Sequence, residues 1–122
     1  TTGALHFGGA WPRHTYLAHS YKFPAKDAAE DFHVYALEWT ADEIKWFVDG
    51  KLCKTRTKEE WFSETAKENP RAPYDQPFHL IINLAVDGRF FEKTDQRADQ
   101  IATDAFPQTF QCDYVRVYQW AD

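Results

Sequence analysis

The sequence has only two cysteines among its 122 residues. Cys53 and Cys112 are too few and too far apart for a metal knuckle or a redox C-x-x-C pair, so a disulfide between them and two buried thiols are the open alternatives. Long hydrophobic runs are also missing. The longest nearly uncharged stretch, residues 78–86, spans about nine residues, less than half of the ~20 that cross a bilayer. We therefore expect no transmembrane helix and no membrane partner.

Positive charge is in the minority, since the formal net charge is -5 at pH 7 and the acids are spread along the chain. A protein that binds a phosphate backbone needs lysines and arginines clustered on one face, so we expect no nucleic-acid partner. No basic segment followed by an apolar one opens the sequence. We therefore expect that any signal peptide lies upstream of Thr1 or has been removed, and that the start is internal.

The sequence also lacks the common catalytic motifs. It contains no G-x-x-x-x-G-K-[ST], H-E-x-x-H, G-x-S-x-G or EF-hand pattern, which removes the usual support for phosphate-loop, zincin, α/β-hydrolase and EF-hand functions. Pairs of adjacent acids do occur, but neighbouring side chains on a strand point to opposite faces, so we interpret them as solvated charges. These pairs are Glu30-Asp31, Asp42-Glu43 and Glu59-Glu60.

The histidines do not form a metal-binding pattern. His14 and His19 are five residues apart, a spacing that fits neither one helix face nor one strand face, and we interpret them as loop histidines. His33 and His79 lie in apolar segments, where a hydrogen-bonded structural histidine is the commoner outcome.

What the sequence has is an aromatic share of 17% within a hydrophobic content of 43%, which indicates a folded domain. Apolar side chains alternate in residues 32–39, which predicts a strand. A second strand is predicted at 44–48, and Asp49-Gly50 is a strong hairpin signal because both turn positions need positive φ. The returning strand is predicted over 51–55. Trp39 and Trp46 are assigned mainly to the core.

The second half of the chain continues the all-β pattern. Residues 58–67 predict a short helix or helical turn, residues 78–86 a central and largely buried strand, and residues 110–120 a closing strand. Strands with one minor helix and no internal repeat indicate an antiparallel all-β domain. Strands of this number leave apolar edges that soluble proteins pair or cover, so we expect further strands from an N-terminal half absent from this chain.

Several separated segments together resemble the second half of family-16 glycoside hydrolases, and the likeness is nearest to bacterial laminarinases. The segments read GALHFGGAWP at 3–12, DFHVYALEW at 31–39, IKWFVDG at 44–50, FHLIINLAVDG at 78–88 and DYVRVY at 113–118. The resemblance covers nearly the whole chain. It implies that residues 1–122 are the C-terminal part of a single antiparallel β-sandwich domain, a concanavalin-like jelly roll whose concave face forms an open polysaccharide cleft.

Members of this family hydrolyse with retention, using a strand that carries E-x-D-x-x-E. Glu and Asp at alternate strand positions face the same cleft, and retention requires carboxyl groups only ~5 to 5.5 Å apart. The 122-residue sequence contains no such motif, which the resemblance places a short distance before Thr1. We therefore expect no catalytic residue in this chain, no cofactor for catalysis, and no activity unless an N-terminal part completes the domain.

Two residues near the start are candidate substrate-binding residues. By its match to the strand that follows the catalytic one, His6 is expected to bond sugar hydroxyls or the catalytic carboxylates, the alternative being a buried histidine. Trp11 follows two glycines that permit a sharp turn, and a ring there can stack on an apolar pyranose face. Simple loop packing is the alternative for Trp11.

Three further substrate-binding candidates come from the second half. Asn83 lies within an apolar strand pattern, where an amide must find a partner, and we assign it to the cleft. Relatives often read G-G-x-W in the following segment, whereas this chain has Asp87-Gly88-Arg89-Phe90-Phe91. Phe90 or Phe91 is expected to replace the aromatic platform, and Arg89 to reach sugar hydroxyls.

Asp113 resembles the position at which many relatives hold a structural calcium ion on the convex face. Calcium takes 6–8 oxygen ligands, so one aspartate needs partners from the N-terminal region, and the alternative for Asp113 is an acid that caps nearby amides.

Three functions follow from the resemblance. The first is a secreted, extracellular or periplasmic, endo-β-1,3-glucanase whose partners are β-1,3-glucan and the N-terminal fragment of the same domain. The second is a non-catalytic β-glucan recognition protein of the same fold. The third, a lectin-like module of another sandwich family, does not explain the match in several separated segments.

Overall fold

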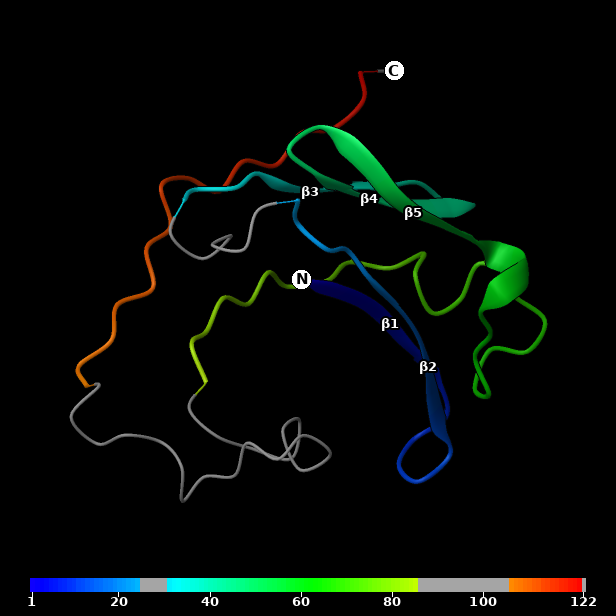
Figure 1. Cartoon of the computed structure of the whole chain (residues 1–122). Coiled ribbons are helices and arrows are strands. Elements are labelled where there is room, and N and C mark those ends of the chain that lie inside the picture. Colours follow the sequence, from blue (N-terminus) through cyan, green and yellow to red (C-terminus); the bar gives the residue numbers. More distant parts are fainter. Residues whose placement is uncertain (25–30, 86–105, 122) are drawn as a thin grey trace. The chain divides into compact units, whose positions relative to one another are not determined.

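The computed structural model describes residues 1–24, 31–85 and 106–121. The chain divides into two compact units, Thr1–Phe78 and His79–Asp122, which are described separately. All the assigned strands lie in the first unit, as Figure 1 shows. They are β1 (Thr2–Gly8), β2 (His14–Ser20), β3 (Tyr35–Trp39), β4 (Glu43–Val48) and β5 (Lys51–Thr57), followed by the short 3-10 helix η1 (Lys58–Glu60).

The strands form two antiparallel sheets. One sheet pairs β1 with β2 in a register that runs from Thr2 opposite Ser20 to Gly8 opposite His14. The other has the order β3-β4-β5. An irregularity between Trp46 and Phe47 shifts the register of β4 and β5, as a β-bulge does.

The β4–β5 hairpin turns at the predicted dipeptide. Asp49 and Gly50 have φ values of 50° and 75°, the left-handed conformation that this turn requires. The Asp49 carboxylate accepts a hydrogen bond from the Val34 amide (2.9 Å) and contacts His33 Nδ1 (2.8 Å). The Val34 amide and then His33 hold the pKa of Asp49 below its usual value. The turn is thereby tied to the chain that leads into β3.

The core lies between the two sheets of the first unit. Leu5 and Phe7 of β1 form a buried cluster with Ile44 of β4 and with Trp61 and Tyr74 from the segment after β5. The partly buried Leu17 and Trp46 pack against this cluster. Because side chains alternate along a strand, the apolar face of β1 is committed to the core and its other face is exposed.

The sequence-based predictions are confirmed for the all-β class, for the strands near 32–39, 44–48 and 51–55, and for the hairpin turn between the last two. The first of these strands begins at Tyr35 rather than Phe32, and the helical turn predicted over 58–67 is reduced to Lys58–Glu60. Trp46 contributes to the core, as predicted, whereas Trp39 is 41% exposed.

The interpretation of His14 and His19 as loop residues is wrong, because both lie on β2. Their side chains point to opposite faces of that strand. His14 is exposed, and the ring centroid of His19 lies 5.0 Å from that of Trp46 in the other sheet. A strand with polar residues at both ends gives little alternation signal, which explains the error.

The strands predicted at 78–86 and 110–120 are not found among the described residues. Phe78–Ala85 and the described residues after 105 have no strand assignment, and large apolar side chains there are exposed, including those of Ile81, Val117 and Trp120. A strand is defined by hydrogen bonds to a neighbouring strand, and no described residue supplies such a partner to these segments. An apolar pattern alone therefore overstated the sheet.

Cys53 and Cys112 are free thiols in the structure. Within the described ranges, no helix has both the length and the apolar character needed to span a membrane.

A single added methyl group tests the packing between the sheets. A Cβ atom at Gly3 would lie 2.4 Å from His19 Cε1 and 3.0 Å from the Trp46 ring. We expect Gly3→Ala to lower the free energy of unfolding by about 1–3 kcal/mol, because an overpacked interface must shift. Urea unfolding of the protein that carries this chain measures the change.

Ala4→Ser is the matched control, since Ala4 is exposed on the other face of the same strand. It is expected to change the free energy of unfolding by less than about 0.5 kcal/mol. Equal losses for the two variants would contradict the packing of the sheets at Gly3.

Candidate functional site

The exposed face of the β1–β2 hairpin carries a pair of rings. Leu5 and Phe7 point into the core, so the side chain of His6 between them points outward. Its cross-strand partner is Tyr16, and the two rings stack with centroids 5.4 Å apart and planes 27° apart. The two rings are turned toward each other, and the polar atoms at their edges can form hydrogen bonds with the hydroxyl groups of a sugar.

A second pair of rings lies at the end of the hairpin. Gly8 has a φ of 96° and begins the turn into β2. Trp11 lies in this turn with 80% of its surface exposed, and its ring centroid is 5.1 Å from that of His14. An exposed indole in a short turn is available to a ligand rather than to the core.

A hollow of about 490 Å³ lies beside these rings. The hairpin lines one side of it, and the loop that follows η1 lines the other. Hydroxyl groups come from the loop, where Ser63 Oγ and Thr65 Oγ1 are 3.1 Å apart. The residues that line the hollow include His6, Gly9, His14, Ser63, Thr65 and Pro73.

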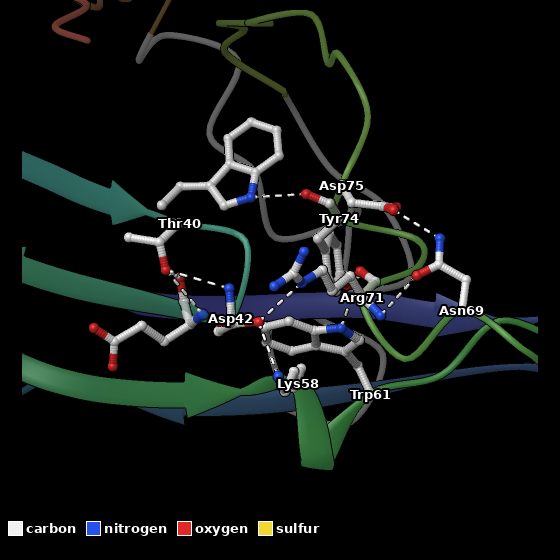
Figure 2. Close-up of polar contacts among 10 residues, drawn as sticks. Thr40, Asp42, Lys58, Trp61, Asn69, Arg71, Tyr74 and Asp75 are labelled. Carbon is white, nitrogen blue, oxygen red and sulfur yellow. Dashed lines mark hydrogen bonds and ion pairs between the residues drawn. The ribbon is translucent and has the colours of Figure 1, made fainter. Parts of the chain in front are cut away.

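A buried phenol is one of the contacts that connect the loop to the strand that bears His6. Tyr74 Oη donates a hydrogen bond to the carbonyl oxygen of His6 at 2.8 Å. Burial raises the pKa of Tyr74 to about 12, so the phenol stays protonated and remains a donor. Two indoles hold the same loop, as Figure 2 shows: Trp39 Nε1 donates to the Tyr74 carbonyl (2.8 Å) and Trp61 Nε1 to that of Arg71 (3.3 Å).

An ion cluster around Asp42 joins the loop to the β3–β4 turn and to η1. Asp42 Oδ1 lies 3.0 Å from both Lys58 Nζ and Arg71 Nε (Figure 2). The hydrogen bonds from Lys58 and then Arg71 hold the pKa of Asp42 below its usual value. Asn69 Nδ2 donates to Asp75 at 2.7 Å and closes the loop on itself. These contacts form a frame whose residues do not line the hollow beside the rings.

The structure brings two of the predicted substrate-binding residues to the same hairpin, namely His6 and Trp11. Asn83 is exposed and outside any strand in the second unit, so its expected setting within a buried strand is wrong. Arg89 and Phe90 lie outside the described residues. The cleft roles of these residues stay predictions.

Asp113 is exposed in the second unit. In the described ranges, no group of three or more histidine, cysteine, aspartate or glutamate residues is arranged to hold a metal ion. Asp113 alone therefore falls short of the 6–8 oxygens of a calcium site, and the described residues do not fit that ion without further ligands.

The sequence analysis did not single out Tyr16, Ser63, Thr65 or Tyr74. Tyr16 becomes visible only through the register that places it opposite His6. The others are brought to the hairpin from a loop more than forty positions away in the printed sequence, and no local pattern marks them.

The comparisons with known proteins agree with one another. The sequence model described as Glycosyl hydrolases family 16 matches residues 5–84. The glucan endo-1,3-beta-glucosidase A1 of Niallia circulans is 45% identical over 119 residues, which are 97% of this chain and 17% of that protein. The beta-glucanase of Rhodothermus marinus is 43% identical over 95 residues, 78% of this chain and 31% of that protein.

A third relative carries a different kind of name. The beta-1,3-glucan-binding protein of Penaeus monodon is 34% identical over 97 residues, 69% of this chain and 26% of that protein. The chain thus spans less than a third of the length of each of these three relatives. No solved structure shows a significant match.

The ion cluster leads to a pH dependence with a definite sign. Because the folded-state pKa of Asp42 lies below its ordinary value of 3.8, its contribution to stability is complete above that value. The contribution is lost as the pH falls through the lowered folded-state pKa. We expect Asp42→Asn to be less stable than the wild type near neutral pH and to approach it in strong acid.

Urea unfolding of the protein between about pH 7 and about pH 2 measures this difference. Lys22→Gln removes an exposed charge outside the cluster and serves as the control, which should leave the acid dependence as in the wild type. A constant difference between Asp42→Asn and the wild type over the whole range would contradict the role of the ion cluster.

Proposed function

Because the chain belongs to family 16 of the glycosyl hydrolases, we propose that it is part of an endo-β-1,3-glucanase that cleaves internal bonds of β-1,3-glucan with retention. The observation that carries the proposal is the 45% identity, over nearly all of the chain, to a protein named glucan endo-1,3-beta-glucosidase. The substrate and activity of the whole protein belong to this proposal, since the chain is a small fraction of its relatives' length.

The role of this chain in the reaction is to bind and orient the glucan. Retention needs two carboxyl groups ~5 to 5.5 Å apart, one as nucleophile and one as acid and base. The sequence lacks E-x-D-x-x-E, so an N-terminal part of the domain supplies these groups. His6 and Tyr16 offer a stacked pair of rings with polar edges, and Trp11 offers an exposed indole, so these residues hold a glucosyl unit beside the reacting bond.

The remaining sequence-based candidates extend the same proposal. Asn83 and Arg89 offer hydrogen bonds to sugar hydroxyls, and Phe90 offers a further ring for stacking. Secretion is also part of the proposal, because a polymeric glucan does not cross a membrane intact.

A second candidate function is a non-catalytic β-glucan recognition protein. The 34% identity to a protein named beta-1,3-glucan-binding protein supports it. The two functions differ in the upstream strand, so sequencing the N-terminal part through its E-x-D-x-x-E positions decides between them. Intact glutamates favour the enzyme.

The enzymatic proposal is tested with laminarin and the protein that carries this chain. We expect it to release reducing sugar from laminarin. We expect Trp11→Ala to raise KM about two- to tenfold with little change in kcat, because a stacking contact is worth about 0.5–1.5 kcal/mol. Steady-state kinetics measures both values.

Trp11→Phe is the matched control, since it keeps a ring in the turn and should retain most of the affinity. An unchanged KM in Trp11→Ala would overturn the role of this residue in binding. A wild-type protein that binds laminarin but releases no sugar would favour the recognition function over the enzyme.

A structural calcium ion is a separate part of the proposal. Asp113 is the ligand that we assign to it among the described residues, with further oxygens supplied by the N-terminal region. We expect calcium to raise the Tm of the protein, because an ion that binds only the folded state stabilises it, and Asp113→Asn to reduce that rise. Thermal unfolding with calcium and with a chelator measures the effect. A Tm that a chelator leaves unchanged would rule the site out.

A further inference from the structure

The turn that presents Trp11 is attached to a neighbouring segment at its first residue. The Gly8 amide donates a hydrogen bond to the Phe62 carbonyl at 3.1 Å, and the Glu64 amide donates to the Gly8 carbonyl at 3.1 Å. Gly8 and Ser63 form a parallel β-bridge between these two bonds. The start of the turn is thereby fixed by backbone alone.

The rest of the turn is held to the neighbouring segment by the side chain of Glu64 rather than by backbone. This carboxylate lies directly against Gly9, because a Cβ atom at Gly9 would come within 2.2 Å of Glu64 Oε2. The same oxygen lies 3.3 Å from Arg13 Nη1, and the side chains of Glu64 and Arg13 are 27% and 72% exposed. One carboxylate therefore touches both ends of the segment from Gly9 to Arg13.

The ion pair has a clear electrostatic reason. Glu64 Oε2 is shielded from solvent and accepts no well-formed hydrogen bond from the described residues. A shielded carboxylate oxygen is costly unless a positive group lies nearby, and the Arg13 guanidinium is that group. The contact thereby gives the exposed Arg13 side chain a charged partner on the loop.

Backbone hydrogen bonds connect Arg13 to residues on the other side of Trp11 in the turn. The Arg13 amide donates to the Ala10 carbonyl at 2.8 Å, and the Gly9 amide to the Arg13 carbonyl at 3.4 Å. Trp11 lies between these bonded residues and is 80% exposed, with His14 as its ring neighbour. Few contacts of its own orient this ring, so the direction of the indole follows from the turn.

We propose that Glu64 is a positioning residue for glucan binding, whose carboxylate holds Arg13 and so the turn that presents Trp11 to a glucosyl ring. The inference rests on the proposed function, because it requires that Trp11 binds the sugar. Glu64 acts through Arg13 and Gly9 rather than by contact with the substrate.

The first test removes the charge of Glu64 and keeps its size. Glu64→Gln is expected to raise KM for laminarin about two- to fivefold with kcat unchanged, because an ion pair open to solvent on one side is worth up to about 1 kcal/mol. Laminarin is uncharged, so salt acts on this step through the protein. Added sodium chloride should raise the wild-type KM toward that of Glu64→Gln and leave the KM of the variant constant.

A second variant reaches the same contact from the other side. Gly9→Ala should push the Glu64 side chain away from Arg13 and raise KM by a similar factor. Combining it with Glu64→Gln should add little, because both changes remove one contact. Glu68→Gln is the matched control, since Glu68 is an exposed acid on the same segment and should leave KM and its salt dependence as in the wild type.

The outcomes separate this inference from the proposed function. A raised KM in Trp11→Ala, with wild-type KM and salt dependence in both Glu64→Gln and Gly9→Ala, would overturn the role of Glu64 and leave the glucanase proposal intact. A wild-type KM in Trp11→Ala itself would overturn the binding role of Trp11 and with it the role of Glu64, whereas the glucanase proposal fails only if the protein releases no sugar from laminarin. If Glu64→Gln does not fold, as circular dichroism would show, Gly9→Ala and the salt dependence of the wild type still decide the question.

Discussion

The phenol of Tyr74 donates its hydrogen bond to the carbonyl oxygen of His6, and the arrangement of the site depends on this contact. The Tyr74 ring is part of the buried cluster, whereas the His6 side chain is on the exposed face of β1. A net bond of this kind is worth only about 1 kcal/mol, but a buried group left without its partner costs about 1–3 kcal/mol. Core packing and the geometry of the hairpin are therefore coupled at the backbone of His6.

The same strand serves both purposes because its side chains alternate. Leu5 and Phe7 fill the space between the sheets, and His6 between them is left exposed. The frame behind the site, built from Asp42, Lys58 and Arg71, lies on the loop side and does not contribute to the exposed rings. The buried side chains and the exposed rings thus lie on different faces of the same strand.

Local signals in the sequence were sufficient for the β4–β5 hairpin, because Asp49-Gly50 determines the turn by its own conformation. They failed for residues 78–86 and 110–120, because strand pairing depends on a partner that apolar composition does not identify. His6 and Trp11 were found through the family motif and the glycines before the turn. Tyr74 and Glu64 were not, since each acts on a strand or turn far from it in the sequence.

This chain lacks E-x-D-x-x-E. The proposed function therefore assigns glucan binding to this chain and bond cleavage to another part of the protein. In the proposed function, stacked rings and an exposed indole would make similar contacts with a glucan before and during bond cleavage, so they would contribute mainly uniform binding, which lowers KM without raising kcat. Only groups whose interactions strengthen as charge develops at the reacting carbon raise kcat, and those are the upstream carboxylates of the proposed mechanism. In the proposed function, the task of this chain is therefore to place the sugar, which would depend on the Tyr74 bond at His6 and the Glu64 contact at the turn.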